Sequence, residues 1–445
     1  MKTSPSSQKQ RDYIGKAIGL VERDQLTKLA MDMVNIPSRT GEEEDLARFM
    51  VDYMAGLGLE AYYQAIEERR GNAIGRLRGS GEGPDLMFNG HLDTTWVGVE
   101  QEDYPSTGLR PQPEALKPIA RLEGDWISGL GIWNMKGADA CTVIAADAVK
   151  RAGVPLKGDV ILTLVAGEIE KAQVEAAMKD YTGRHFRGSG VGTEFALRHG
   201  VTADFGINVE PDEPVSSATA GFCWFKVRTK GRTGYGPRRS TAKNAILDMY
   251  KVIEEIEAWA KEYSRQTTEE MQSPQASIGA IEAGWPYKPS AIPGVCQIYV
   301  DVRILPEVAP NSIRREFGEV LGRARAKHPD LDVDFDMYFS RPGTRTDPQN
   351  WIVRSCMGGY EWVTGRRQAH ANGTSGSRDD SFMRLFGIPT ASMGPTRGRP
   401  EQGGLPFWAG EAMNINTLLD AVKIYIYAIV DTCTRTREEV GLAGR

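Results

Sequence analysis

The sequence predicts an α/β fold in which a mixed sheet is flanked by helices, with a smaller α+β domain of the ferredoxin-like type inserted into it. Buried-strand patterns alternate with amphipathic helices up to residue 215 and again from residue 341. Between them, the order strand, helix, strand, strand, helix, strand is typical of an α+β sandwich. A chain of 445 residues also exceeds what one hydrophobic core usually supports. We therefore expect a main domain formed by residues 1–215 and 341–445, and an inserted domain at 216–340.

The composition excludes several classes of protein. The formal net charge is -5, and acidic and basic residues are interspersed, which argues against a nucleic-acid or anionic-membrane surface. The first residues lack the apolar core of a secretory signal, and no run is long enough for a transmembrane helix, so we expect a cytoplasmic protein. The five cysteines are scattered and never form a Cys-x-x-Cys pair, which favours buried thiols over disulfides or a structural zinc site.

The first part of the chain predicts two helices followed by a series of strands. Apolar residues recur at helical spacing over residues 23–36 until Pro37, and a second amphipathic helix opens after Gly41. Strands are expected at 72–77 and 85–89 with a Gly-rich turn between them. A helix at 138–153 and strands at 159–165 and 204–209 complete this part.

The remaining elements follow the same rules. In the inserted domain we expect strands at 222–229, 276–283, 296–304 and 332–339, and helices at 242–263 and 312–328. After residue 350 the chain returns to alternating strand and helix patterns, with a Gly/Ser-rich loop at 371–377, a strand at 389–393 and a final helix at 416–433.

The stretch MFNGHLDTTWVG, residues 87–98, contains the first candidate site residues. Because side chains alternate along an extended segment, His91 and Asp93 are expected to project the same way. A carboxylate placed there can orient an imidazole that binds a metal ion. An ordinary hydrogen-bonded histidine at a strand end is the alternative, since a His-x-Asp triplet is not specific by itself.

Three further segments place polar residues where strands or turns end. Glycines at 129, 131 and 137 surround Asn134 and allow a close backbone approach to a ligand. The strand at 159–165 leads to Glu168, and the strand at 204–209 leads to Glu210. The carboxyl ends of strands in open α/β sheets are where ligands bind.

These motifs stand in the order and spacing of the M20 family of metallopeptidases and aminoacylases, which the sequence resembles over nearly its whole length. MFNGHLDTT, GLGIWNMKG, LVAGEIEK and the Glu210-Pro211 pair resemble the family's metal and catalytic motifs, and FGIPTASMGP resembles its closing strand. Asn244-Ala245-Ile246 and DVRILP, residues 301–306, resemble motifs of its lid domain. The resemblance implies a catalytic α/β domain and a smaller lid domain that often dimerises, and we expect a homodimer through the lid.

Four positions depart from the family pattern. The aspartate that usually bridges two metal ions is Asn134, and the ligand glutamate after the catalytic glutamate is Ile169. The C-terminal ligand histidine falls near Phe407, and the lid histidine near Tyr235. We therefore expect one divalent cation per chain, held by His91, Asn134 and Glu210 with waters. Zinc, manganese and cobalt all suit such a ligand set.

The resemblance gives catalytic roles to three residues. Glu168 would be the general base, and Asp93 would orient the imidazole. Tyr235 would donate a hydrogen bond to developing negative charge in place of the lid histidine. Each has a simpler alternative, namely a surface charge, a loop cap and turn packing. Glu170 as a substitute ligand is the less favoured alternative to a solvated charge.

Substrate contacts are expected from aromatic, basic and amide side chains near these motifs. Trp96 and Trp133 flank the two metal motifs and favour a flat or apolar substrate part, although core packing is the alternative for each. Arg378, in the loop ANGTSGSRDD, favours a carboxylate, with surface pairing as its alternative. Asn134 is as suited to binding substrate as to binding metal. His370 is one further candidate ligand.

Two functions are consistent with these residues. The first is a one-metal hydrolase that cleaves a C–N bond of a small carboxylate-bearing molecule, such as an N-acyl amino acid, a peptide-like amide or an aryl amine, with Glu168 as base. The second is a metal-poor, inactive protein that binds a small molecule or regulates on the same scaffold, because four functional positions differ at once.

Overall fold

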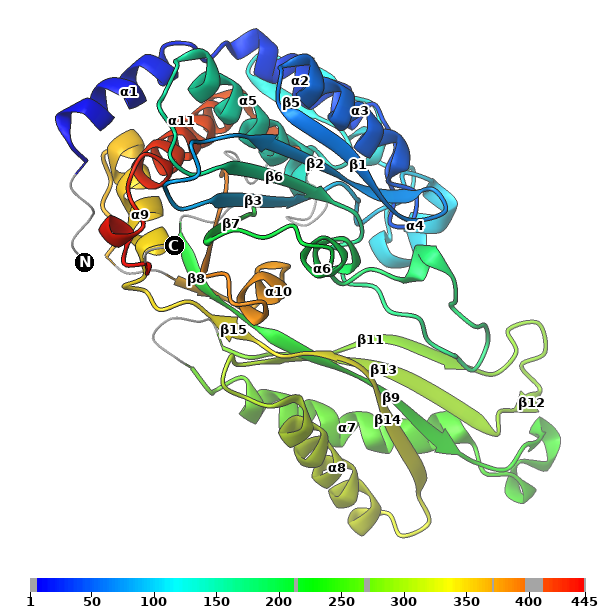
Figure 1. Cartoon of the computed structure of the whole chain (residues 1–445). Helices are drawn as coiled ribbons and strands as arrows, with labels where there is room; N and C mark the ends of the chain where they lie inside the picture. Colours follow the sequence, from blue (N-terminus) through cyan, green and yellow to red (C-terminus); the bar gives the residue numbers. More distant parts are fainter. Residues whose placement is uncertain (1–5, 212–214, 268–272, 370–371, 397–410, 444–445) are drawn as a thin grey trace.

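The computed structural model describes residues 6–211, 215–267, 273–369, 372–396 and 411–443 (Figure 1). Within them, nine strands form one large mixed sheet, in which the path β1-β2-β6-β3-β7-β17-β8-β15 is joined by β16 beside β8. Strands β6, β3, β7 and β17 run parallel, while β1 and β2 are antiparallel additions at one edge. The expected α/β architecture with a mixed sheet is confirmed. These strands are β1 Glu60–Glu67, β2 Arg70–Leu77, β3 Leu86–His91, β6 Val160–Val165, β7 Phe205–Val209, β8 Ser216–Thr219, β15 Thr344–Arg345, β16 Asn372–Thr374 and β17 Thr390–Met393.

Helices cover both faces of this sheet. The larger core lies on the face covered by α1, α2, α3, α5, α9 and α11, while α6 and α10 pack on the opposite face around a smaller core (Figure 1). Helix α5 is rich in alanine and buried along almost its whole length, because small side chains let it approach the sheet closely. The bounds are α1 Gln8–Ile18, α2 Arg23–Val34, α3 Glu44–Gly56, α5 Gly137–Arg151, α6 Val191–Arg198, α9 Trp351–Thr364, α10 Asp380–Leu385 and α11 Ile415–Cys433.

The inserted domain has its own sheet and its own hydrophobic core. The sheet has the order β11-β13-β9-β14, and α7 and α8 cover one of its faces. Alternate residues of β9 are buried against these helices, and the residues between them, on the other face of the sheet, are mostly only partly buried. The bounds are β9 Gly221–Lys230, α7 Ala245–Tyr263, β11 Ala276–Ala283, β13 Val295–Ile304, α8 Pro310–Lys327 and β14 Asp332–Arg341.

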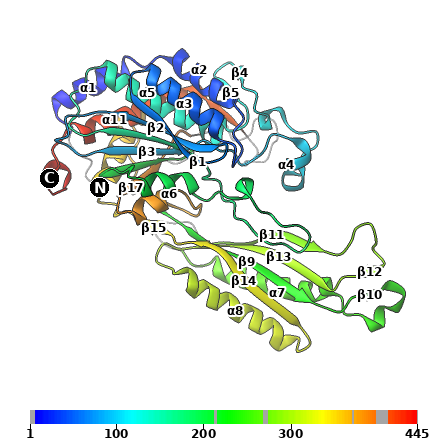
Figure 2. The same cartoon turned by 45° about the vertical axis from the view of Figure 1, so that its right-hand side comes forward.

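Short elements complete the described chain. Strands β10 Gly234–Tyr235 and β12 Ala291–Ile292 pair at the end of the inserted domain that points away from the large sheet (Figure 2). Strands β4 Arg121–Glu123, β5 Trp126–Ser128 and β18 Ala412–Asn414 form a small separate sheet, and α4 spans Glu100–Thr107.

The two crossings between the domains lie side by side. A side chain at Gly221 would meet the backbone of Arg341 and Gly343 at 2.3 Å, so only glycine allows this approach. Strand β8 pairs within the large sheet, which places the first crossing after Thr219. The division into a main and an inserted domain remains our proposal, with its first boundary after Thr219 and not at the expected residue 216.

Several local elements differ from the sequence-based expectation. Helix α1 was missed because its residues are mostly polar, yet Ile14 and Ala17 are fully buried, and Ser7 with Gln10 forms a capping box at its start. Strand β1 was also missed, since its edge position leaves most of its residues only partly buried and weakens the alternation. All five cysteines are buried and free, as expected. In the described residues, none of the helices is both long and apolar enough to span a membrane.

Candidate active site

Three neighbouring parallel strands deliver the candidate site residues to one edge of the large sheet. Strand β3 lies between β6 and β7 and ends at His91. Glu168 follows the end of β6 by three residues, and Glu210 follows β7 directly. The carboxyl ends of these strands therefore bring together three residues that are distant in the sequence, as the rule for open α/β sheets predicts.

The ring of His91 is buried and has a fixed orientation. Its Nδ1 lies 2.9 Å from the backbone oxygen of Asp93, so Nδ1 carries a hydrogen that it donates. Its Nε2 faces Asn134 Oδ1 at 3.2 Å and Glu168 Oε2 at 3.6 Å. Burial alone lowers the pKa of His91, but contact with Asp93 and the charges of Glu168 and Glu210 outweigh it and raise that pKa well above its usual value.

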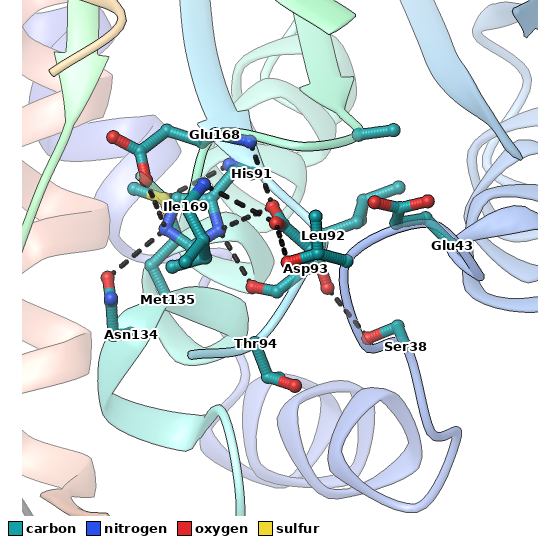
Figure 3. A network of polar contacts seen from close by, with 12 residues as sticks. Ser38, Glu43, His91, Leu92, Asp93, Thr94, Asn134, Met135, Glu168 and Ile169 are labelled. Carbon is teal, nitrogen blue, oxygen red and sulfur yellow. Dashed lines mark hydrogen bonds and ion pairs between the residues drawn. The ribbon is translucent and has the colours of Figure 1, made fainter. Parts of the chain in front are cut away.

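Asp93 connects His91 to the segment that carries Glu168 (Figure 3). Its Oδ1 lies 3.4 Å from His91 Nδ1 and accepts the backbone N–H of Glu168 at 3.0 Å. Its Oδ2 accepts the backbone N–H of Ile169 at 3.3 Å and the hydroxyl of Thr40 at 2.8 Å. Burial opposes the ionised form, yet the hydrogen bonds with His91 and Thr40 and the charges of His91 and Arg70 lower the pKa of Asp93. The carboxylate therefore orients the loop after β6 as well as the imidazole.

Asn134 reaches the site from the turn before α5. Its backbone, with φ -121° and ψ 90°, departs from helical geometry, and this break directs the amide toward His91 (Figure 3). The Sδ atom of the next residue, Met135, accepts the backbone N–H of His91 at 3.0 Å. The Gly-rich turn thus packs directly against the end of β3.

Glu168 is buried and surrounded by both signs of charge. Desolvation raises its pKa well above the usual value, and Glu210 and Asp379 add to that shift, whereas His91 and Arg341 oppose it. A carboxyl whose pKa is raised by burial beside a fixed imidazole has the properties of a general base or acid.

Glu210 and Arg378 meet on the other side of the site. The Oε1 atom of Glu210 accepts a hydrogen bond from Asn208 Nδ2 at 3.2 Å, and its Oε2 lies 3.8 Å from Arg378 Nε. Both side chains are largely buried. The arginine expected to bind a substrate carboxylate is therefore already close to one of the expected metal ligands.

Two charged residues near Glu168 are not predicted by the sequence. Arg341, from the end of β14, lies between the rings of Phe222 and Phe382 at 5.4 and 5.3 Å, and its Nη1 is 3.5 Å from Asp379 Oδ1. Burial raises the pKa of Asp379 to about 6, although Arg341 and the hydroxyl of Thr193 oppose this shift. The run Arg378-Asp379-Asp380 in a Gly/Ser-rich loop was the available signal for Asp379. No sequence signal connected Arg341 with it.

A buried carboxyl in α5 was also missed. Asp139 is fully buried, and neither of its oxygen atoms has a hydrogen-bond partner. Desolvation raises its pKa well above the usual value. An acid within a run of small apolar residues was the signal that could have identified it.

Of the remaining candidate residues, one lies away from the large sheet. Tyr235 is 55% exposed and lies in β10, at the distal end of the inserted domain (Figure 2). Trp133 packs partly against the main core, and its backbone N–H donates to Glu411 Oε2 at 3.1 Å. The backbone oxygen of Trp96 accepts a hydrogen bond from the Thr94 hydroxyl. Glu170 forms an ion pair with Arg303, so it is neither a solvated charge nor directed to His91 as a ligand. His370 and Phe407 lie outside the described residues.

Two oxygen donors, Asn134 Oδ1 and Glu168 Oε2, face His91 Nε2. Nδ1 holds the ring hydrogen, so in a neutral ring the lone pair of Nε2 faces the oxygens of Asn134 and Glu168. The lone pairs repel one another unless a proton or a cation lies between them. Donors bound at about 2.0–2.1 Å to a tetrahedral ion lie roughly 3.4 Å from one another, which resembles the distances from Nε2 to Asn134 and Glu168. These distances do not include Glu210, the third expected ligand. No group of three or more His, Cys, Asp or Glu residues arranged for a metal occurs in the described part of the chain, so such a site depends on the amide of Asn134.

Comparison with known proteins confirms the resemblance to the M20 family. Residues 217–329 match the family model described as the peptidase dimerisation domain of M20 enzymes. One relative, N-formyl-4-amino-5-aminomethyl-2-methylpyrimidine deformylase of Bacillus subtilis, is 22% identical, and the alignment covers 94% of this chain and 96% of the relative.

Solved structures show the same fold. Human carnosine dipeptidase 1 has a TM-score of 0.72 at 12% identity, and the match covers 97% of this chain and all of that one. An M20 family metallo-carboxypeptidase from Sulfolobus solfataricus has a TM-score of 0.67 at 13% identity, covering 92% of this chain and 99% of that one. At these identities the structures establish the fold alone.

Proposed function

Because this chain carries an M20 peptidase dimerisation domain inserted in an M20-type fold, we propose that it is a metal-dependent hydrolase that cleaves the C–N bond of a small amide. The observation that carries the proposal is the convergence of Nε2 of His91 and the carboxylate of Glu168 at the ends of adjacent parallel strands. The relatives named above include a deformylase and peptidases, all of which act on amide bonds.

His91, Asn134 and Glu210 would hold one divalent cation. Bound there, a zinc, manganese or cobalt ion lowers the pKa of water and polarises a carbonyl oxygen. The Nδ1 contact with the backbone of Asp93 supports this arrangement, since it keeps Nε2 directed into the site.

Glu168 would move the proton in this reaction. Its carboxylate would accept a proton from the attacking water and deliver it to the amine nitrogen as the C–N bond breaks, so that the products are a carboxylic acid and an amine. Burial and the charges of Glu210 and Asp379 raise the pKa of Glu168 well above its usual value, and His91 and Arg341 oppose this shift only in part. The positive charge of a bound cation would favour the ionised carboxylate that this role requires. Asp93 would position both His91 and Glu168.

The substrate is a small molecule with an acylated amine. Arg378 supports a carboxylate or another anionic group on the substrate, although its closeness to Glu210 means that the two would share this task. We also propose that the protein forms a homodimer through the inserted domain, which the match to a dimerisation domain supports.

A panel of N-formyl and N-acetyl amines and dipeptides, assayed with zinc, manganese or cobalt, tests the proposal. We expect turnover of at least one compound, dependent on added metal and lost in Glu168→Gln. If neither the panel nor the metals gave Glu168-dependent turnover, the alternative of a metal-poor binding protein would replace it. The observation in favour of the metal-poor binding protein is that, in the described residues, His, Cys, Asp and Glu side chains alone do not form a group of three around a metal, so the amide of Asn134 would have to serve as a ligand.

A further inference from the structure

The loop after β6 is held from two sides at consecutive residues. Within the large domain, the carboxylate of Asp93 accepts the backbone N–H groups of Glu168 and Ile169. From the inserted domain, Arg303 of β13 contacts Glu170. Two residues of extended chain span at most about 7 Å, so a displacement of Glu170 is transmitted directly to Glu168.

The contact between Arg303 and Glu170 is a two-point ion pair. Nη1 of Arg303 donates to Oε1 of Glu170 at 2.6 Å, and Nη2 donates to Oε2 at 2.5 Å. Nε of the same guanidinium donates to Asp301 Oδ2 at 2.7 Å, which fixes its orientation on β13. About one fifth of each paired side chain is exposed. Bidentate pairs of this kind restrict geometry more strongly than a single contact.

Two further contacts tie the same loop to the sheet of the inserted domain. Nζ of Lys226, on β9, donates to the backbone oxygen of Glu175 at 3.1 Å. Oε2 of Glu282, on β11, accepts the backbone N–H of Ala177 at 2.9 Å. Three strands of the inserted domain therefore contact the segment between Glu170 and Ala177, on the sheet face that α7 and α8 leave uncovered (Figure 1).

We propose that Arg303 and Glu170 are positioning residues that couple the orientation of the inserted domain to the placement of the Glu168 carboxylate. The two domains are also joined by two adjacent chain crossings near Gly221 and Gly343, besides the contacts of Lys226 and Glu282 with the loop. Rotation about these crossings moves Arg303 relative to the large sheet. Because the ion pair holds Glu170 to Arg303, that movement changes the position of the Glu168 carboxylate relative to His91. The catalytic consequence rests on the proposed function, whereas the mechanical coupling does not.

Backbone amide exchange tests the coupling without any substrate. In the full-length protein, Glu170→Gln and Arg303→Gln are each compared with wild type for exchange in peptides that contain Glu168 and Ile169. We expect about tenfold faster exchange in both single variants, and no further increase in the double variant, because the two residues act through one contact. Asp334→Asn is the matched control, since it breaks an ion pair with Arg228 on the same sheet that does not touch the loop.

The decisive comparison is between Arg303→Gln and wild type, because Arg303 lies in the inserted domain and the exchange is measured at Glu168 and Ile169 in the large domain. Unchanged exchange in Arg303→Gln, or an equal effect in Asp334→Asn, would overturn the proposal. Glu170→Asp keeps the charge and should restore part of the protection, which a general loss of folding would not do.

Kinetics then test the consequence for Glu168. On an N-formyl or N-acetyl amine that the wild type hydrolyses, Glu170→Gln should lower kcat about tenfold and leave KM nearly unchanged. A raised KM with unchanged kcat would show instead that the pair binds substrate, and would overturn the positioning role. If the wild type hydrolysed none of these compounds, the proposed function would fail, while the exchange experiment would still decide the coupling.

Discussion

The Oδ1 atom of Asp93 accepts the backbone N–H of Glu168 at 3.0 Å, although the two residues belong to different strand ends. The same carboxylate lies beside His91 Nδ1 and accepts the N–H of Ile169. One buried side chain thus sets the relative position of the imidazole and of the carboxylate proposed as base.

Replacing Asp93 by asparagine should lower both stability and turnover. An amide NH₂ cannot accept a hydrogen bond, so one buried N–H loses its partner, at about 1–3 kcal/mol. We expect at least a tenfold loss of kcat, because Glu168 is no longer aligned. The matched control is Asp85→Asn, since Asp85 accepts the backbone N–H of Asp159 at 2.7 Å away from the site. Thermal unfolding should show that both variants are destabilised, whereas activity assays should show a loss of kcat in Asp93→Asn alone. Equal activity losses in the two variants would contradict this account.

Glu168→Gln should abolish turnover while the protein keeps its metal. Proposed general bases contribute about 10²–10⁴-fold to rate. Since glutamine has nearly the same shape and the backbone bonds to Asp93 remain, the melting temperature should not fall. Steady-state rates with metal analysis of the same samples measure both properties. A variant with more than a tenth of wild-type kcat would show that another group moves the proton.

Gly167→Ala should destabilise the protein more than Gly387→Ala. Both glycines have positive φ, +68° and +81°, so alanine is strained at either position. At Gly167 the new methyl group would lie 1.9 Å from Nη2 of the buried Arg70, whereas nothing lies within 4 Å at Gly387. We expect Gly167→Ala to cost roughly 1–3 kcal/mol more in chemical denaturation. Equal costs would show that Arg70 moves aside freely.

The stability of the protein relative to Lys136→Met should rise between pH 7 and pH 9. Burial lowers the pKa of Lys136 to about 7, against 10.5 for an ordinary lysine, while Glu411 and Asp139 oppose the shift. In this interval the native lysine has lost its proton and the unfolded lysine has kept it, so the unfolded state binds more protons and stability increases with pH. The expected gain is roughly 2 kcal/mol over the two pH units. Denaturant unfolding of both proteins at pH 7, 8 and 9 measures it, and a flat or falling difference would contradict a depressed native pKa.

Much of the large sheet could be predicted from local patterns. Strands β3, β6 and β7 are short, apolar and fully buried, and such runs are typical of a parallel sheet covered on both faces. Their carboxyl ends carry His91, Glu168 and Glu210, so those residues could be identified before their proximity was known. Helix α1 and strand β1 could not be predicted in this way, because their residues are mostly polar or partly exposed and their burial depends on tertiary contacts.

The site residues that the sequence did not predict depend on contacts between the domains or between distant loops. Arg341 lies at the end of β14 and becomes relevant only because the crossing at Gly343 brings it beside Asp379 and Phe382. The sequence around Glu170 is compatible with a metal ligand or a solvated charge, and its partner Arg303 lies 133 residues further along the chain. No local pattern encodes such pairs, since a charged residue is compatible with many partners.

Metal content is the most direct test of the central proposal, a hydrolase with a single cation on His91, Asn134 and Glu210. The metal-free protein would be dialysed against zinc or manganese, and the bound ion measured per chain by mass spectrometry, beside His91→Ala. We predict one equivalent in the wild type and none in the variant. Two equivalents in the wild type, none at all, or one equivalent that persists without His91 would contradict the proposed site.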